Sequence, residues 1–216
     1  RLHGETHPIE RPMEELLGGV GEVVAAHDRY MASQLERNGV RVLRGQARFV
    51  DRFRLEVIRI GAPALRIEAP RILIATGSRP RAPDHLAIDH EHVLDSDSIL
   101  SLSWLPRSLL VIGGGVIACE YASIFAALGT RVLQLDRNAR PLAFVDAELT
   151  DIYVAALCER GGAFRGGIAP AHLAWDGIAQ VQAQLASGER IAADKALVAL
   201  GRIANVEELQ LDVAGV

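Results

Sequence analysis

The sequence has few cysteines and no excess of positive charge. Only two cysteines occur among its 216 residues, Cys119 and Cys158. They lie far apart, which excludes both a disulfide framework and a CxxC redox or metal-binding pair. The chain has 23 Lys and Arg residues against 27 Asp and Glu residues, a net charge of −4. This balance argues against a partner such as nucleic acid or an anionic membrane surface, and small molecules are the expected partners.

Long apolar runs are also missing. No run reaches the roughly 20 residues that a membrane-spanning helix needs, and the first residues lack the apolar region of a signal peptide. We therefore expect a cytoplasmic protein that does not enter a membrane. Hydrophobic residues still make up 50% of the chain, enough for one large core or two small ones. The first residue is Arg rather than Met, which predicts that the sequence belongs to a longer protein.

The first part of the chain, residues 1–94, combines one helix with several short strands. Apolar residues recur at threes and fours over 13–35, the stripe of an amphipathic helix, and Gly18, Gly19 and Gly21 predict a break in it. Short Val-, Ile- and Leu-rich runs then predict strands at 40–43, 47–50, 54–60, 65–68 and 71–75. A segment rich in Pro and His follows and is interpreted as a linker.

The second part, residues 95–216, has the order strand, glycine turn, helix, strand. Residues 109–112 predict the first strand, 116–128 the helix and 131–135 the second strand. A further helix is predicted at 146–160, a hairpin around Asp176 and Gly177, and a last strand at 196–200. This alternation predicts an α/β fold with a Rossmann-like nucleotide-binding domain at 95–216.

The glycine turn carries the clearest functional pattern. Gly113 permits a tight turn after the strand, and Gly115 lets a pyrophosphate approach the backbone at the positive end of the following helix. Ala118 takes the place of the last glycine of the fingerprint. The second strand ends in Asp136, at about the distance expected for the acid that binds the adenosine ribose. A dinucleotide site is favoured over a purely structural turn because the context fits as well as the glycines.

The residues after the second strand give mixed evidence on the nucleotide. Asp136 favours the free 2′-hydroxyl of NAD, whereas Arg137 and Arg140 are suited to the 2′-phosphate of NADP. Either arginine would equally be expected as a solvated surface residue. The preference between NAD and NADP therefore stays open.

The remaining reactive residues give weaker signals. His85, His90 and His92 lie among acidic residues, but their spacing is not that of metal ligands, and a solvated loop is favoured over a metal site. For Cys119, packing is favoured over a nucleophilic role. Glu120 lies within two turns of the glycine turn and is a candidate contact for the nicotinamide end. No catalytic residue is predicted.

Four stretches in the same order resemble the flavoprotein pyridine nucleotide-disulfide oxidoreductases: residues 45–49, 74–80, 113–120 and 199–205. The resemblance implies an FAD-binding portion at 1–94 and an NAD(P)-binding domain at 95–216. It implies that FAD contacts Ala47, Ala75, Thr76 and Gly77. It also implies that the nicotinamide nucleotide contacts Gly113, Gly115, Ala118, Glu120, Asp136, Arg137 and Gly201.

Within this family, residues 95–100, 119–125 and 142–146 are most similar to the soluble pyridine nucleotide transhydrogenases. This branch transfers hydride from NADPH to NAD through bound FAD, and its members are homo-oligomers. The alternatives are a disulfide reductase like dihydrolipoamide dehydrogenase and a non-catalytic redox sensor. The family's first FAD fingerprint, redox-active cysteine segment, later Gly-Asp motif and dimerisation domain are missing here. We therefore expect the 216 residues alone to hold FAD poorly and to be inactive.

Overall fold

The computed structural model describes residues 12, 13 and 17–216 and divides the chain into two compact units. The first unit contains residues 80–202, with the described residues before Gly18. The second contains residues 18–79 and 203–216. These units differ from the predicted ranges 1–94 and 95–216. Residues 80–94 belong to the first unit because Val93–Leu94 pair with a strand of its sheet, and the last residues return to the second.

The second unit begins with helix α2, Val20–Arg37, which follows a turn at Gly18 and Gly19. The predicted break in the helix of residues 13–35 is confirmed here, although residues 14–16 of that prediction lie outside the described part of the chain. Gly21 is accommodated within α2. The helix ends at Arg37, and the N–H of its capping residue Asn38 donates to the carbonyl of Gln34 at 3.2 Å.

An antiparallel sheet of three strands follows, with β1 at Gln46–Asp51, β2 at Arg54–Arg59 and β3 at Ala62–Glu68. These correspond to the strands predicted at 47–50, 54–60 and 65–68. Phe49 and Val57 are buried on one face of the sheet. At the end of the chain, the short helices η2 (Glu207–Leu209) and α5 (Leu211–Ala214) lie against β1.

Two predicted strands are not formed. Residues 40–43 and 71–75 have no strand structure. Their apolar composition is that of buried strands, but a strand needs a neighbour with which to pair its N–H and C=O groups. No strand of the described part of the chain pairs with either segment, and Leu73 is 90% exposed. The prediction was wrong because composition alone does not supply the partner.

The first unit is built on a parallel sheet of five strands in the order β5–β12–β6–β7–β8. Their bounds are Val93–Leu94, Lys195–Val198, Ser108–Ile112, Arg131–Asp136 and Ala163–Gly166. Helix α3, Val116–Ala127, connects β6 to β7, and α4, Ala147–Glu159, connects β7 to β8. The predicted strand, turn, helix and strand around Gly113 are confirmed. Since β7 and β12 lie on opposite sides of β6, the strand order reverses at β6.

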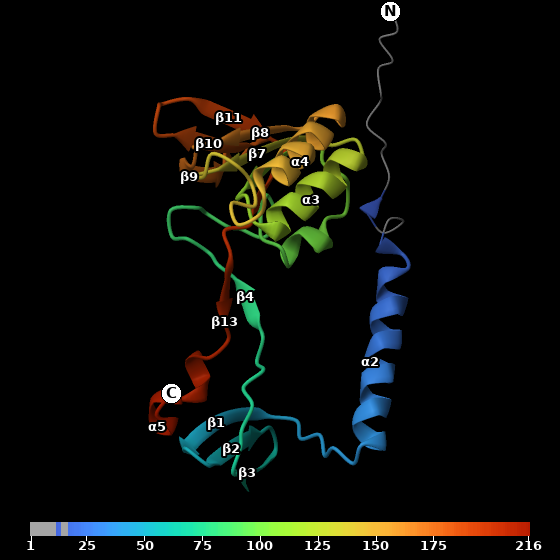
Figure 1. Cartoon of the computed structure of the whole chain (residues 1–216), viewed down its shortest axis with the longest axis vertical. Helices are drawn as coiled ribbons and strands as arrows, with labels where there is room; N and C mark the ends of the chain where they lie inside the picture. The colour runs from blue at the N-terminus through green and yellow to red at the C-terminus, as the bar shows by residue number, and fades with distance from the viewer. Residues whose placement is uncertain (1–11, 14–16) are drawn as a thin grey trace, which may run out of the picture. The chain divides into compact units, whose positions relative to one another are not determined.

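The sheet is covered on both faces, as Figure 1 shows. Along β6, Leu109 and Val111 face α3, whereas Leu110 and Ile112 face a second sheet made of three antiparallel strands. Those strands are β9 (Pro170–Trp175), β10 (Val181–Leu185) and β11 (Arg190–Ala193). This alternation explains why β6 is a continuous apolar run. The result is a three-layer fold with the predicted α/β character, in which an antiparallel sheet rather than helices covers one face of the parallel sheet.

Aspartate side chains stabilise the start of α4 and the loop between β9 and β10 by accepting backbone N–H groups. The Asp146 carboxylate accepts a hydrogen bond from the N–H of Glu148 and caps α4, as predicted from its start at 146. The Asp176 carboxylate accepts three backbone N–H groups in the loop between β9 and β10, so the predicted hairpin is confirmed. A 3-10 turn, η1, covers Ser98–Ser101. Strands β4 (Ser78–Pro80) and β13 (Arg202–Ala204) pair with each other in a two-stranded sheet.

Within the described residues, no helix is both long enough and apolar enough to cross a bilayer.

Candidate functional site

The turn after β6 requires glycine at its first position. Gly113 has φ +127°, and a Cβ there would lie 2.4 Å from the carbonyl oxygen of Ala199 in the neighbouring β12 segment. The Gly113 N–H donates to the carbonyl of Leu135 at 2.8 Å. The turn is therefore pressed between the ends of β12 and β7, and a side chain has no room.

The next two glycines face different surroundings. A Cβ on Gly114 would lie 2.8 Å from Cγ of Asp136, so the turn packs directly against this carboxylate. Gly115 is the N-terminal capping residue of α3, and a Cβ there would meet nothing within 4 Å. The open side of the turn is thus at Gly115, at the positive end of the helix dipole.

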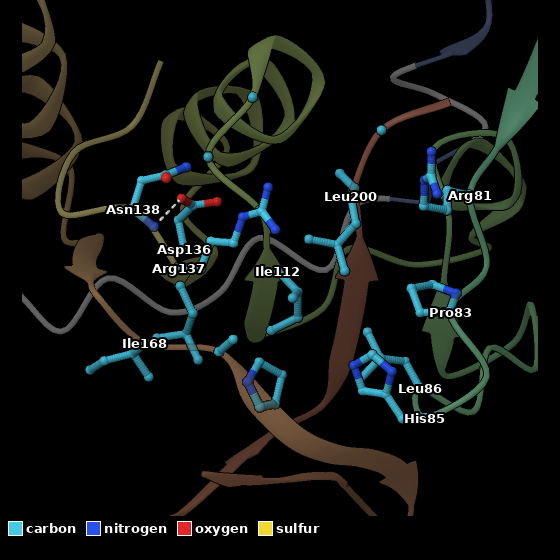
Figure 2. A pocket seen from close by; sticks show the side chains of 18 residues that line it. Arg81, Pro83, His85, Leu86, Ile112, Asp136, Arg137, Asn138, Ile168 and Leu200 are labelled. Atoms are coloured by element: carbon cyan, nitrogen blue, oxygen red, sulfur yellow. Dashed lines mark hydrogen bonds between the residues drawn. The ribbon is translucent and has the colours of Figure 1, made fainter. Parts of the chain in front are cut away.

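The open side borders a cavity of about 650 Å³ at the carboxyl ends of β6, β7 and β12. This position, beside the strand where the order reverses, is where open α/β sheets bind ligands. Figure 2 shows the cavity with Asp136, Arg137 and Asn138 on one side. The structure brings together five of the predicted nucleotide contacts in its lining, namely Gly113, Gly115, Asp136, Arg137 and Gly201.

Asp136 ends β7 and is only 7% exposed. Its carboxylate accepts a hydrogen bond from the N–H of Asn138 at 2.7 Å, which fixes it at the edge of the cavity. Arg137 also lines the cavity, but Arg140 does not. The Arg140 guanidinium donates instead to the Asp151 carboxylate and, at 3.0 Å, to the carbonyl of Ala147. The sequence analysis treated the two arginines as equivalent, but only Arg137 is available to a ligand in the cavity, because Arg140 is bonded elsewhere.

The opposite side of the cavity is formed by residues that sequence reasoning missed. Arg81 and His85, from the segment interpreted as a linker, lie across from Asp136, with Leu200 between them (Figure 2). The Arg81 N–H donates to the carbonyl of Gly201 at 3.0 Å, which holds this segment against the end of β12. No local pattern in the sequence indicates this contact, because it depends on the pairing of β5 with β12, which are about a hundred residues apart.

Two other predicted residues lie outside this cavity. Ala118 is fully buried beneath the turn, and a Cβ on Gly113 would be 3.5 Å from its side chain. Glu120 lies on an exposed part of α3 and lines a separate cavity of about 550 Å³, together with Val116. A small cavity of about 180 Å³, lined by Gly115, Val116 and Gly201 among others, lies next to both.

The residues predicted to contact FAD belong to the second unit. Ala47 is half-buried in β1, and Ala75, Thr76 and Gly77 are exposed. Asn205 holds the latter segment: its N–H donates to the carbonyl of Gly77 at 3.0 Å and its side-chain amide to that of Thr76 at 3.2 Å. Hydrogen bonds therefore connect the sequence stretches 74–80 and 199–205.

The histidine-rich segment has structural contacts. His92 stacks on Trp175 with ring centroids 3.7 Å apart, and Asp89 binds backbone N–H groups of its own loop. His90 lies 3.5 Å from the Asp95 carboxylate. Within the part of the chain that the structure describes, no group of three His, Cys, Asp or Glu residues has the geometry of a metal site.

Cys119 is buried in α3, and burial raises the pKa of its thiol. A raised pKa leaves less of the reactive thiolate, so the surroundings of Cys119 are those of a packing residue rather than of a nucleophile.

Comparison with known families identifies one match over nearly the whole chain. The profile of the family described as pyridine nucleotide-disulphide oxidoreductase matches residues 3–216. The soluble pyridine nucleotide transhydrogenase of Colwellia psychrerythraea is 36% identical over 204 residues, which cover 94% of this chain and 43% of the relative. That of Hahella chejuensis is 38% identical over 197 residues, covering 91% and 41%. The chain spans less than half the length of these relatives.

Solved structures show the same fold. The HOCl-induced flavoprotein disulfide reductase RclA from Escherichia coli, in its Cu(II) complex, is 30% identical, with a TM-score of 0.73 over 82% of this chain and 40% of that one. LpdA from Mycobacterium tuberculosis gives a TM-score of 0.87 over 99% of this chain and 47% of that one. At 24% identity, the likeness to LpdA concerns the fold alone.

Proposed function

Because the chain belongs to the pyridine nucleotide-disulphide oxidoreductase family, we propose that it is the nucleotide-binding portion of an FAD-dependent enzyme that transfers hydride between NADPH and NAD. The names of the relatives at 36% and 38% identity support this reaction. A cytoplasmic location, a role in redox homeostasis and a homo-oligomeric state belong to the same proposal. The domain assignment also belongs to it, with FAD-binding residues in the second unit and the NAD(P)-binding domain in the first.

The observation that carries the proposal is the cavity at the carboxyl ends of β6, β7 and β12. Its volume of about 650 Å³ is in the range of small-molecule and cofactor sites. The Asp136 carboxylate is suited to the adenosine ribose, and the open side of the turn at Gly115 is suited to the pyrophosphate. Gly201, with φ +101°, borders both this cavity and the small one beside it, which is suited to the nicotinamide end.

Other residues have supporting roles in the proposal. Ala118 packs beneath the turn, so its role would be to let α3 approach the sheet. Glu120, which lines the neighbouring cavity together with Val116, would contact the nicotinamide end. Ala47, Ala75, Thr76 and Gly77 would hold FAD, which supplies the hydride-accepting chemistry when bound. The protein residues bind and orient the nucleotide.

Titration calorimetry of the intact protein with NADH and NADPH tests the site. We expect both nucleotides to bind, and Asp136→Ala to weaken NADH binding by about tenfold, since a hydrogen bond to a charged group contributes roughly 1.5–3 kcal/mol. Asp176→Ala is the matched control, because it also removes a carboxylate that accepts backbone N–H groups but lies in the β9–β10 hairpin. Absence of binding, or equal losses in the two variants, would contradict the proposed site.

A second assay separates the reaction from that of a disulfide reductase. The intact enzyme with FAD is mixed with NADPH and either an NAD analogue or a disulfide. The proposal predicts reduction of the analogue; reduction of the disulfide alone would favour the reductase, and turnover of neither would favour a redox sensor.

A further inference from the structure

Behind the glycine turn lies a connected set of polar side chains that the proposed function has not used: Gln134 and Cys119 are buried, and Tyr153 is half-buried. Gln134 of β7 is fully buried, and its side-chain amide N–H donates to the carbonyl of Gly113 at 2.9 Å. The same amide nitrogen lies 3.4 Å from the sulfur of Cys119. The amide oxygen of Gln134 accepts a hydrogen bond from the hydroxyl of Tyr153 in α4 at 2.7 Å. Burying an amide in a parallel sheet costs free energy unless its polar atoms are hydrogen-bonded. In Gln134 the amide nitrogen donates and the amide oxygen accepts.

The set reaches the turn at two successive carbonyls. Besides the bond from Gln134 to Gly113, the thiol of Cys119 donates to the carbonyl of Gly114 at 3.7 Å, as does the N–H of Leu142 at 2.6 Å. Burial raises the pKa of both the Cys119 thiol and the Tyr153 hydroxyl, so each keeps its proton and remains a donor. The hydrogen bonds thus run in one direction, from Tyr153 through Gln134 and Cys119 to the turn.

The direction of these carbonyls determines the direction of the neighbouring N–H groups. In a planar trans peptide the C=O and the following N–H point to opposite sides. Fixing the Gly113 carbonyl on Gln134 therefore turns the N–H of Gly114 away from the core, and fixing the Gly114 carbonyl does the same for Gly115. Glycine is the residue whose backbone rotates most freely, so a turn of three glycines needs external contacts to hold one arrangement.

We propose that Gln134, supported by Tyr153 and Cys119, is a positioning residue that presents the N–H groups of the Gly113–Gly115 turn to the pyrophosphate of the nicotinamide nucleotide. The inference rests on the proposed function of the cavity. It assigns the role to a side chain behind the turn, which does not touch the nucleotide itself.

The test compares nucleotide affinity with stability in the intact protein. Gln134→Leu removes both the donor and the acceptor, and Tyr153→Phe removes only the hydroxyl that orients the amide. Thr130→Val is the matched control: Thr130 is also buried, and its hydroxyl donates to the carbonyl of Pro106 at 2.8 Å, away from the turn. The Kd of NADPH is measured by calorimetry and the Tm by calorimetric scanning for each variant.

We expect Gln134→Leu to raise the Kd of NADPH by about tenfold, because the N–H groups of the turn would no longer be held in place for the pyrophosphate. Tyr153→Phe should raise it by a few-fold. Thr130→Val should lower the Tm comparably and leave the Kd unchanged. The amide NMR signals of Gly114 and Gly115 should shift in the two turn variants and stay in place in the control.

Each outcome bears on one of the two proposals. If the unsubstituted protein binds NADPH but all three variants bind it equally well, the positioning role is overturned and the proposed site stands. If the unsubstituted protein binds no nucleotide, the proposed function fails and the positioning role fails with it. Should Gln134→Leu not fold, Tyr153→Phe with the NMR signals decides, because it leaves the volume of the core almost unchanged.

Discussion

The glycines of the turn after β6 differ in what an added side chain would contact. Substituting them therefore distinguishes an effect on stability from an effect on nucleotide binding. Gly113→Ala would put a Cβ 2.4 Å from a backbone oxygen at φ +127°, and we expect a loss of at least about 2 kcal/mol of stability. Gly115→Ala meets open space and an ordinary φ of −79°, so the Tm should stay almost unchanged. Since Gly115 borders the cavity, its added methyl group should weaken nucleotide binding. Thermal unfolding and calorimetric titration of both variants check this, and weakened stability in Gly115→Ala would contradict it.

The two arginines after Asp136 make a matched pair for nucleotide preference. Arg137 lines the cavity, whereas Arg140 is bonded to Asp151 and Ala147. We expect Arg137→Ala to raise the Kd of NADPH by about tenfold or more, because a charge-assisted bond to the 2′-phosphate is lost, and to leave that of NADH nearly unchanged. Arg140→Ala should change neither. Equal effects of the two substitutions in titrations with both nucleotides would show that Arg137 does not contact the 2′-phosphate.

At the scale of elements, the loop before β5 depends on one carboxylate. Asp89 accepts the N–H groups of Glu91, His92 and Val93 at 2.9, 2.7 and 2.8 Å. Burial raises the pKa of Asp89, but these three bonds outweigh it and hold the pKa below its usual 3.8. The charged form therefore stabilises the loop that leads from the Arg81 side of the cavity into the sheet.

This loop gives a pH-dependent prediction. A depressed pKa in the folded state means that the stabilisation is fully present above the usual value of 3.8 and is lost as the pH falls through the folded value. We expect Asp89→Asn to lower the Tm clearly at pH 5 and progressively less toward pH 3. Scanning calorimetry of the two proteins over this range measures the difference. A Tm difference that stays constant with pH would assign the effect to packing.

The elements also show what local sequence can predict. The turn at Gly113, helix α3 and the position of Asp136 were predicted because spacing within about 25 residues determines them. The absence of strands at 40–43 and 71–75 was missed, because a strand depends on a partner that spacing does not reveal. The contribution of Arg81 and His85 to the cavity was missed for the same reason: it depends on the pairing of β5 with β12.

At the scale of the whole molecule, the two units have separate cores. The first unit has buried clusters on both faces of its parallel sheet, such as the one that contains Leu110. In the second, Phe49 and Val57 are buried in a sheet of three strands. Units with their own cores are expected to unfold as separate cooperative transitions. Leu110→Ala should then lower only the first unit's transition, by about 2–5 kcal/mol, and Val57→Ala only the second's, by about 2 kcal/mol.

Nucleotide binding should act on one of these transitions alone. Every residue that lines the cavity lies between positions 80 and 202, so the proposed site requires NADPH to bind only the folded first unit. A ligand at a hundred times its Kd stabilises by about 2.7 kcal/mol, which corresponds to a Tm increase on the order of 10 °C. Scanning calorimetry with and without NADPH should therefore show the transition that Leu110→Ala identifies moving upward while the one that Val57→Ala identifies stays in place. If both move together, the two units unfold as one, and the nucleotide stabilises the second unit through the first.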